Sequence, residues 1–251
     1  MTAHRLRPSR HTFKKTGVLL DDFFSVHEYR GQYELHAGGM SAEQRTLVFE
    51  RGDSVAALLY DPSHSEVILV EQFRLPTALR GGDGWILEPT AGRLRTDETP
   101  RQCMLREFEE ETGYQPSELI PISTFFVSPG GSSERIHLFY AEVRRTQQTV
   151  RGGGVEAEGE DIHVVRLPLG QFLAMLRNNE FQDAKLIVAG YWLKNRLEAM
   201  STHAAARQRK VSKRLCMPES KGWFRRSVAP ARFVGYYTGN IREIHDVDVW
   251  I

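Results

Sequence analysis

The sequence is poor in cysteine and has no long apolar run. Its 251 residues include two cysteines, Cys103 and Cys216, and no CxxC motif, so a disulfide framework and a cysteine-rich zinc site are excluded. No stretch approaches the roughly 18 apolar residues of a transmembrane helix, and the first residues lack the apolar core of a secretory signal. These absences predict a cytoplasmic protein without a membrane partner.

Acidic and basic residues nearly cancel, with a net charge of +1, but they are segregated along the chain. Segment 1–15 has five basic residues and no acidic one, and 200–251 has ten basic and four acidic residues. The central part, 16–199, therefore has an acidic excess. An acidic body argues against nucleic acid as a partner and favours a site that gathers carboxylates around cations.

Short apolar runs and turn residues organise the central part. Strands are expected at Val18–Leu20, Val26–Tyr29, Tyr33–His36, Thr46–Glu50, Val55–Tyr60, Val67–Phe73, Trp85–Glu88, Ile122–Val127, Ile136–Val143 and Ile162–Leu167. Helices are expected over 99–112, about 169–178 and from Asp183 onward. This order of strands and helices predicts an α/β fold with helices packed on a mixed sheet.

The expected helix over 99–112 carries three carboxylates on one face. Glu107, Glu110 and Glu111 have i, i+3, i+4 spacing, and Cys103 lies one turn earlier on the same face. Like charges stacked in this way repel one another, so a bound hard cation such as Mg²⁺ or Mn²⁺ would explain them. The alternative is a solvated acidic helix whose other side packs on the sheet.

A longer motif surrounds these carboxylates. Gly92 is followed by Glu98 and then by the run Arg106-Glu107-Phe108-x-Glu110-Glu111-x-Gly113-Tyr114. This spacing resembles the Nudix box, with Phe108 and Tyr114 in two slots that usually hold an aliphatic residue. The chain is therefore similar to the Nudix hydrolases, whose substrates are nucleoside diphosphates linked to another group.

Flanking segments are similar to the ADP-ribose pyrophosphatase branch of this family. They are FFSVHEY (23–29), VFERG (48–52), VEQFR (70–74), LEPTAG (87–92), SPGGSSER (128–135) and EGEDIHVV (158–165). The resemblance implies a Nudix fold, in which a mixed sheet lies between helices (α/β/α), with an N-terminal antiparallel β subdomain. The expected parts are a basic leader (1–16), a dimerising β subdomain (17–52), a Nudix hydrolase domain (53–200) and a C-terminal extension (201–251).

The basic and aromatic extension has two interpretations. One is an arm for nucleic acid or another acidic partner. The other is a continued helix followed by a solvated tail, which is the usual meaning of a basic run.

The resemblance also implies a metal site. Two or three Mg²⁺ ions, for which Mn²⁺ can substitute, would neutralise the pyrophosphate and lower the pKa of the attacking water. The implied ligands are the carboxylates of Glu107, Glu110, Glu111 and Glu160 and the main-chain carbonyl of Ala91. Glu98 and Arg106 would form an ion pair that orients the helix.

The general base is expected outside this helix. The loop Gly152–Asp161 starts with three glycines, which predicts a flexible segment, and it contains Glu156, Glu158 and Glu160. Alignment with the family's loop favours Glu158 as the base and Glu160 as a metal ligand. The alternatives are Glu160 as the base and a solvated acidic loop beside the site. A carboxylate near several cations stays ionised, as a base must.

Substrate contacts are expected from arginine, glutamate and aromatic side chains. The candidates are Arg51 and Arg74 for phosphate, Arg93 as a further contact, Glu134 for a ribose hydroxyl, and Phe23 and Phe24 for the base, across a dimer interface as in the family. The alternatives are surface ion pairs, a loop cap and core packing. Arg45-Thr46 stands where the branch has two arginines, the second of which stacks on adenine, so base selectivity is open.

The favoured function is Mg²⁺-dependent hydrolysis of ADP-ribose to AMP and ribose 5-phosphate by a homodimer. One alternative is another nucleoside diphosphate sugar, such as UDP-glucose or GDP-mannose. A second is a non-catalytic nucleotide-binding sensor whose basic tail engages nucleic acid. The intact Glu107, Glu110 and Glu111 argue against a sensor, which has no need of a metal set.

Overall fold

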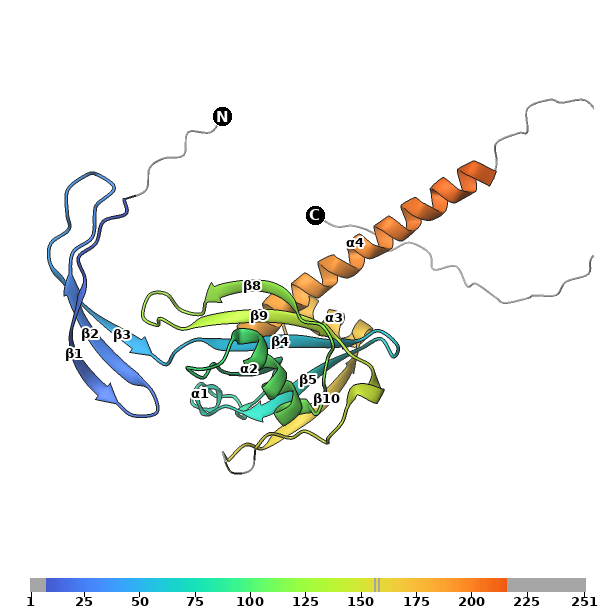
Figure 1. Cartoon of the computed structure of the whole chain (residues 1–251), viewed down its shortest axis with the longest axis horizontal. Helices are drawn as coiled ribbons and strands as arrows, with labels where there is room; N and C mark the ends of the chain where they lie inside the picture. Colours follow the sequence, from blue (N-terminus) through green and yellow to red (C-terminus); the bar gives the residue numbers. More distant parts are fainter. Residues whose placement is uncertain (1–7, 156, 158, 216–251) are drawn as a thin grey trace, which may run out of the picture. The chain divides into compact units, whose positions relative to one another are not determined.

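The computed structural model describes residues 8–155, 157 and 159–215, which form two β-sheets and their helices (Figure 1). The strands are β1 (Lys14–Asp21), β2 (Ser25–Gly31), β3 (Gln44–Glu50), β4 (Ser54–Asp61), β5 (Glu66–Phe73), β6 (Trp85–Glu88), β7 (Thr90–Arg93), β8 (Ile120–Phe126), β9 (Arg135–Glu142) and β10 (Ile162–Pro168). The helices are α1 (Leu75–Ala78), α2 (Pro100–Glu107), α3 (Leu169–Arg177) and α4 (Ala184–Leu215), with a π-helical turn η1 (Phe108–Thr112) and a 3₁₀ turn η2 (Arg145–Gln147).

The larger sheet has seven strands. Its main path is β10-β5-β4-β9-β8, with β6 paired to β5 and β7 paired to β4. Strands β4 and β9 run parallel, and the other neighbours run antiparallel. The expected strands Val55–Tyr60 and Val67–Phe73 form as β4 and β5 and pair as a hairpin. Asp61 Oδ1 stabilises its turn by accepting a hydrogen bond from the main-chain N–H of Ser63 at 2.8 Å.

Hydrophobic cores cover both faces of this sheet because side chains alternate along β4. Ala57 belongs to the core that includes Met104 and Phe108, on the face covered by α2 and η1. Its neighbour Leu58 belongs to the core with Phe172 of α3 and Leu186 of α4, on the other face. The predicted mixed sheet between helices is therefore confirmed (Figure 1).

The smaller sheet, β1-β2-β3, is antiparallel and confirms the expected N-terminal β subdomain. The expected boundary of the leader at residue 16 is wrong, because β1 already begins at Lys14. Before it, Arg10 forms an ion pair with Glu34 at 2.7 Å. The strand expected at Tyr33–His36 is also wrong: the segment makes isolated bridges and a turn, since Gly38 and Gly39 adopt positive φ and reverse the chain.

The chain divides into two compact units after Ala204. The first unit contains both sheets, and the described part of the second is the end of α4. The extension beyond Leu215 lies outside the described residues, so both interpretations of it stay predictions. Even α4, with 32 residues, is not apolar enough to cross a membrane, and the same is true of every other helix in the described part.

Candidate active site

The helix expected over 99–112 forms as α2 followed directly by η1, and Pro100–Thr112 is called the box helix below. Its start is fixed by a capping box: the N–H of Gln102 donates to Thr99 Oγ1 at 3.3 Å, and the N–H of Thr99 donates to Gln102 Oε1 at 2.9 Å. Gly113 ends it with a φ of 73°, directly after the expected last residue, 112. The two caps fix where the box helix begins and ends, and therefore the direction in which its carboxylates point.

The carboxylate face of the box helix is turned toward the sheet. Cys103 and Met104 are fully buried one turn before the carboxylates, where the helix packs against β4 and β7. Glu107 and Glu111 are 8% and 3% exposed. The alternative of a solvated acidic helix is therefore wrong for these two residues, because they share a face with side chains of the core.

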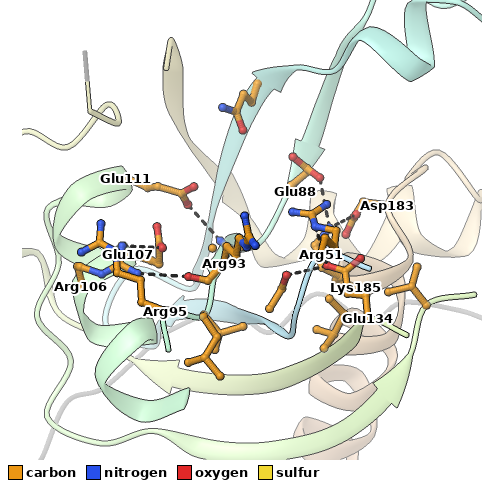
Figure 2. Close-up of a pocket in the computed structure, with 18 of the residues that line it drawn as sticks. Arg51, Glu88, Arg93, Arg95, Arg106, Glu107, Glu111, Glu134, Asp183 and Lys185 are labelled. Atoms are coloured by element: carbon orange, nitrogen blue, oxygen red, sulfur yellow. Dashed lines mark hydrogen bonds and ion pairs between the residues drawn. The ribbon is translucent and has the colours of Figure 1, made fainter. Parts of the chain in front are cut away.

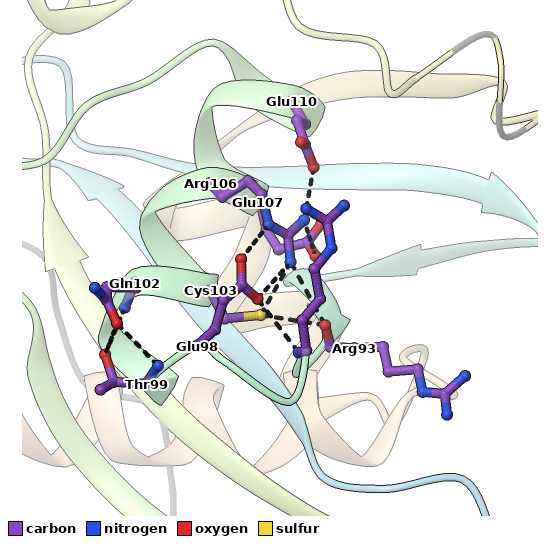
Figure 3. Close-up of polar contacts among 9 residues, drawn as sticks. Arg93, Glu98, Thr99, Gln102, Cys103, Arg106, Glu107 and Glu110 are labelled. Carbon is purple, nitrogen blue, oxygen red and sulfur yellow. Dashed lines mark hydrogen bonds and ion pairs between the residues drawn. The ribbon is translucent and has the colours of Figure 1, made fainter.

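Arg106 lies at the centre of the polar contacts on this helix (Figure 3). It pairs with Glu98 Oε1 at 2.8 Å, which agrees with the structural pair that the resemblance implies. The same guanidinium also donates to Glu107 Oε1 at 2.7 Å and to Glu110 Oε2 at 2.8 Å. The hydrogen bond from Arg106 is the first cause that holds the pKa of Glu98 at about 2. Arg106 therefore compensates the charge of two expected metal ligands as well as Glu98.

Burial outweighs the compensation available to the two inner carboxylates, Glu107 and Glu111. It raises the pKa of Glu107 to about 7, although the charge of Arg106 opposes this rise. Burial, and then the charge of Glu107, raise the pKa of Glu111 well above its ordinary value. The N–H of Ala91 donates to Glu111 Oε2 at 3.2 Å and opposes that rise. Such groups need either a proton or a cation when they are buried.

The donor set fits a hard divalent cation. Its oxygens come from carboxylates, which suit Mg²⁺ or Mn²⁺, and a cation would supply the charge that Glu107 and Glu111 lack. Gly92 leaves room for this arrangement, since a Cβ there would lie 1.8 Å from Glu107 Oε1. Within the described residues, no three His, Cys, Asp or Glu side chains already converge as a metal cluster. The fold therefore brings these carboxylates to one place, and Arg106 holds Glu107 and Glu110 there.

These residues line one wall of a pocket of about 1010 Å³ (Figure 2). Most of the site residues predicted from the sequence line it: Phe23, Arg51, Arg74, Ala91, Arg93, Arg106, Glu107, Glu110, Glu111, Glu134 and Glu160. Phe24 and Glu98 are not among the lining residues in the described part of the chain. The ring of Phe24 instead packs on Phe49, with 4.6 Å between centroids. Glu158, the favoured base, lies outside the described residues.

The candidates for substrate contacts are held by acidic partners. Arg74 pairs with buried Glu88 at 2.7 Å. Arg51 lies 3.5 Å from Glu134 Oε1, the oxygen that also accepts a 2.7 Å hydrogen bond from the hydroxyl of Ser54. These contacts keep both arginines at the pocket wall while leaving part of each guanidinium exposed.

The N-terminal sheet reaches the same pocket within one chain. Arg93 Nη1 donates to the main-chain oxygen of Phe23 at 3.4 Å, and Phe23 lines the pocket of its own chain. Arg45, whose neighbour Thr46 departs from the branch pattern, forms an ion pair with Glu28 at 2.7 Å. Phe23 can therefore contribute to the site of its own chain. The expectation that Phe23 or Phe24 reaches the site of a second chain in a dimer stays a prediction.

A second polar cluster in the pocket was missed by the sequence reasoning. Lys185 forms ion pairs with Glu88 and Asp183, and all three residues line the wall that Figure 2 shows apart from Glu107 and Glu111. The sequence indicated one role for Asp183, at the start of the expected helix. Its Oδ1 does accept a hydrogen bond from the N–H of Leu186 at 2.8 Å. Nothing in the local pattern indicated that its other oxygen pairs with Lys185.

Comparisons with known proteins agree with this geometry. The family model described as NUDIX domain matches residues 50–189. A protein of Salmonella arizonae named GDP-mannose pyrophosphatase is 38% identical over 179 residues, which are 70% of this chain and 91% of that protein. Proteins of the same name from Escherichia coli are 37% identical over the same shares.

A solved structure titled "Crystal structure of ADP compounds hydrolase" has the same fold. Its TM-score is 0.58 at 17% sequence identity, and the match covers 78% of this chain and 96% of that one. The span of the family model contains the seven strands of the larger sheet and the box helix.

Proposed function

Because the chain belongs to the NUDIX domain family and is a Nudix hydrolase, we propose that it cleaves the P–O–P linkage of a nucleoside diphosphate sugar with divalent cations. One observation carries the proposal: Glu107 and Glu111 are buried at the wall of a pocket that also exposes several arginines. Carboxylates of this kind hold cations, and arginines grip phosphates. A pyrophosphate is negatively charged, so bound cations and arginines would both attract it to this pocket.

The metal ligands in this proposal are Glu107, Glu110, Glu111, Glu160 and the main-chain carbonyl of Ala91. Bound Mg²⁺, in two or three copies, supplies charge neutralisation and a more acidic attacking water. The chain's own part is to hold the helix carboxylates through Arg106 and the capping box. Mn²⁺ can substitute because it accepts the same oxygen ligands.

The base that takes the proton of the attacking water is Glu158 in this proposal, with Glu160 as the second candidate. Both precede β10 in the sequence. Glu160 lines the pocket, which supports a role at the site as ligand or base. Arg51, Arg74 and Arg93 contact the phosphates, and Glu134 accepts from a ribose hydroxyl.

The substrate is ADP-ribose in the first version of the proposal, with AMP and ribose 5-phosphate as products. The segments that resemble the ADP-ribose pyrophosphatase branch support it. GDP-mannose is the second candidate, favoured by relatives of that name that match 70% of the chain. In both versions Phe23 offers an aromatic face to the base.

A hydrolysis panel tests the proposal. ADP-ribose, GDP-mannose, UDP-glucose and a diadenosine polyphosphate are incubated with the protein and Mg²⁺, and products are separated by chromatography. The wild-type protein should cleave at least one nucleotide sugar between the two phosphorus atoms, and Glu111→Gln should not, whereas Glu109→Gln should, because Glu109 is exposed. Absence of cleavage across all the nucleotide sugars would refute the proposed substrate class.

We also propose that the protein works in the cytoplasm as a two-fold dimer formed by the N-terminal sheet. Strand β1 is an edge strand, and it exposes Val18, Leu19 and Leu20. Exposed apolar side chains on an unpaired edge are commonly covered by a second chain.

A further inference from the structure

One segment, residues 148–154, satisfies the carbonyls at the end of the box helix. The last four carbonyls of a helix have no partner within the helix. The carbonyl of Glu110 accepts from the N–H of Gly154 at 3.0 Å, and that of Glu111 accepts from the N–H of Gly153 at 2.9 Å. Gly153 and Gly154 are therefore bonded to the main chain of Glu110 and Glu111, two residues whose carboxylates line the pocket.

The same segment caps the next two carbonyls. Thr112 O accepts from Gln148 Nε2 at 3.1 Å, and Gly113 O accepts from the N–H of Thr149 at 2.8 Å. Close approach requires glycine, since a Cβ on Gly152 would lie 2.6 Å from the carbonyl oxygen of Glu111. The glycines that were expected to make a flexible start are therefore an anchored cap in the structure.

Gly154 also borders the side chain of Glu160. A Cβ on Gly154 would lie 2.7 Å from Glu160 Cβ and 2.8 Å from Glu160 Oε2. That oxygen accepts a hydrogen bond from the N–H of Val155 at 2.9 Å, and Glu160 lines the pocket. At Gly153, by contrast, a Cβ would meet the oxygen of Ile162 at an ordinary 3.7 Å.

We propose that Gly154 is a positioning residue that sets where the carboxylate of Glu160 enters the pocket. Its N–H ties the loop to Glu110, and its missing side chain leaves the space that Glu160 occupies. The helix carboxylates and the loop carboxylate then share one rigid frame, which a metal site needs. This inference rests on the proposed function because it takes Glu160 as part of the metal site.

Mn²⁺ binding without substrate tests the proposal. Titration calorimetry compares the wild-type protein with Gly154→Ala, Gly153→Ala, Glu160→Gln and the double variant Gly154→Ala/Glu160→Gln. Both glycines have positive φ, 116° at Gly153 and 86° at Gly154, so Gly153→Ala controls for backbone strain. Gly154→Ala should weaken Mn²⁺ binding by about tenfold or more, and Gly153→Ala should bind close to wild type. The double variant should bind no more weakly than Glu160→Gln, because both changes act on one carboxylate.

Three results would overturn the proposal: equal weakening by the two glycine variants, additive losses in the double variant, or unchanged binding by Glu160→Gln. If Gly154→Ala does not fold, the double variant Gly154→Ala/Glu160→Gly is made. It removes the Glu160 side chain that the new Cβ would contact, so it should fold again. Persistent unfolding of that variant would also overturn it. Failure of the wild-type protein to cleave nucleotide sugars would refute the proposed function alone, because the titration uses no substrate.

Discussion

Arg106 donates to Oε1 of Glu107, its neighbour in the chain, at 2.7 Å, and the same nitrogen donates to Oε2 of Glu110 at 2.8 Å. One guanidinium thus compensates two carboxylates that are proposed to bind metal. A divalent cation and Arg106 act on the same negative charges, so the effect of removing either one should depend on whether the other is present.

Removing Arg106 should destabilise the metal-free protein strongly. Arg106→Ala leaves Glu98, Glu107 and Glu110 without their shared partner, and loss of one member of a largely buried pair costs about 3 kcal/mol. Urea unfolding in EDTA measures the loss, and saturating Mg²⁺ should reduce it. Arg101→Ala, at an exposed position of the same helix, is the control and should change stability little. Equal losses in the two variants would contradict the central role of Arg106.

Glu111→Gln should separate catalysis from stability. It removes a proposed ligand and should lower kcat by about a hundredfold or more at saturating Mg²⁺. The metal-free variant should nevertheless unfold at a higher urea concentration than wild type near pH 8. Burial raises the pKa of Glu111, so folding at this pH must either bury its charge or take up a proton, and glutamine requires neither. Glu109→Gln is the exposed control. A variant with near-wild-type turnover would exclude Glu111 as a ligand.

The stability of the metal-free protein should fall as pH rises from about 4.5 to about 7 through Glu107. The folded protein holds its proton up to a pKa of about 7, whereas the unfolded chain releases it near the ordinary value of 4.5. Stability is lost with rising pH wherever the folded state binds more protons, so this contribution is present below about pH 4.5 and lost above pH 7. Urea unfolding in EDTA at several pH values should show a flatter profile for Glu107→Gln than for Glu109→Gln. Indistinguishable profiles would show that Glu107 does not hold a proton in the folded state.

The base assignment is tested by comparing two variants across pH and Mg²⁺. Glu158→Gln should lower kcat by about 10²- to 10⁴-fold with little change in KM, and higher pH should restore part of the rate. Glu160→Gln should instead raise the Mg²⁺ concentration for half-maximal rate. If Glu160→Gln shows the loss of kcat that pH rescues, the two roles are exchanged. If both variants are mild, the base lies elsewhere.

The oligomeric state is tested by light scattering. A dimer would have a mass of about 57 kDa, twice the 28.7 kDa of the chain. Leu19→Lys, which places a charge at a side chain that is 55% exposed on β1, should shift the protein toward monomer. A wild-type monomer at micromolar concentration that still hydrolyses its substrate would rule out a required dimer.

The sequence by itself determined the family and the local frame of the site. The spacing from Gly92 to Tyr114 identified the box, and Pro100 and Gly113 placed the helix ends, because end signals and carboxylate spacing are local properties. Short apolar runs likewise predicted most strands of the larger sheet, since a strand that is buried on both faces needs apolar residues throughout.

The tertiary structure decided what those residues meet. Glu107 and Glu111 are buried because their face of the helix packs on the sheet, and the same packing lets Arg106 contact three carboxylates. Lys185 pairs with Glu88, which lies 97 residues away in the sequence. The three glycines show the difference most clearly. A run of glycines, such as 152–154, is typical of a flexible segment. In the folded chain, however, the N–H groups of Gly153 and Gly154 bond to carbonyls at the end of the box helix, which have no partner within the helix.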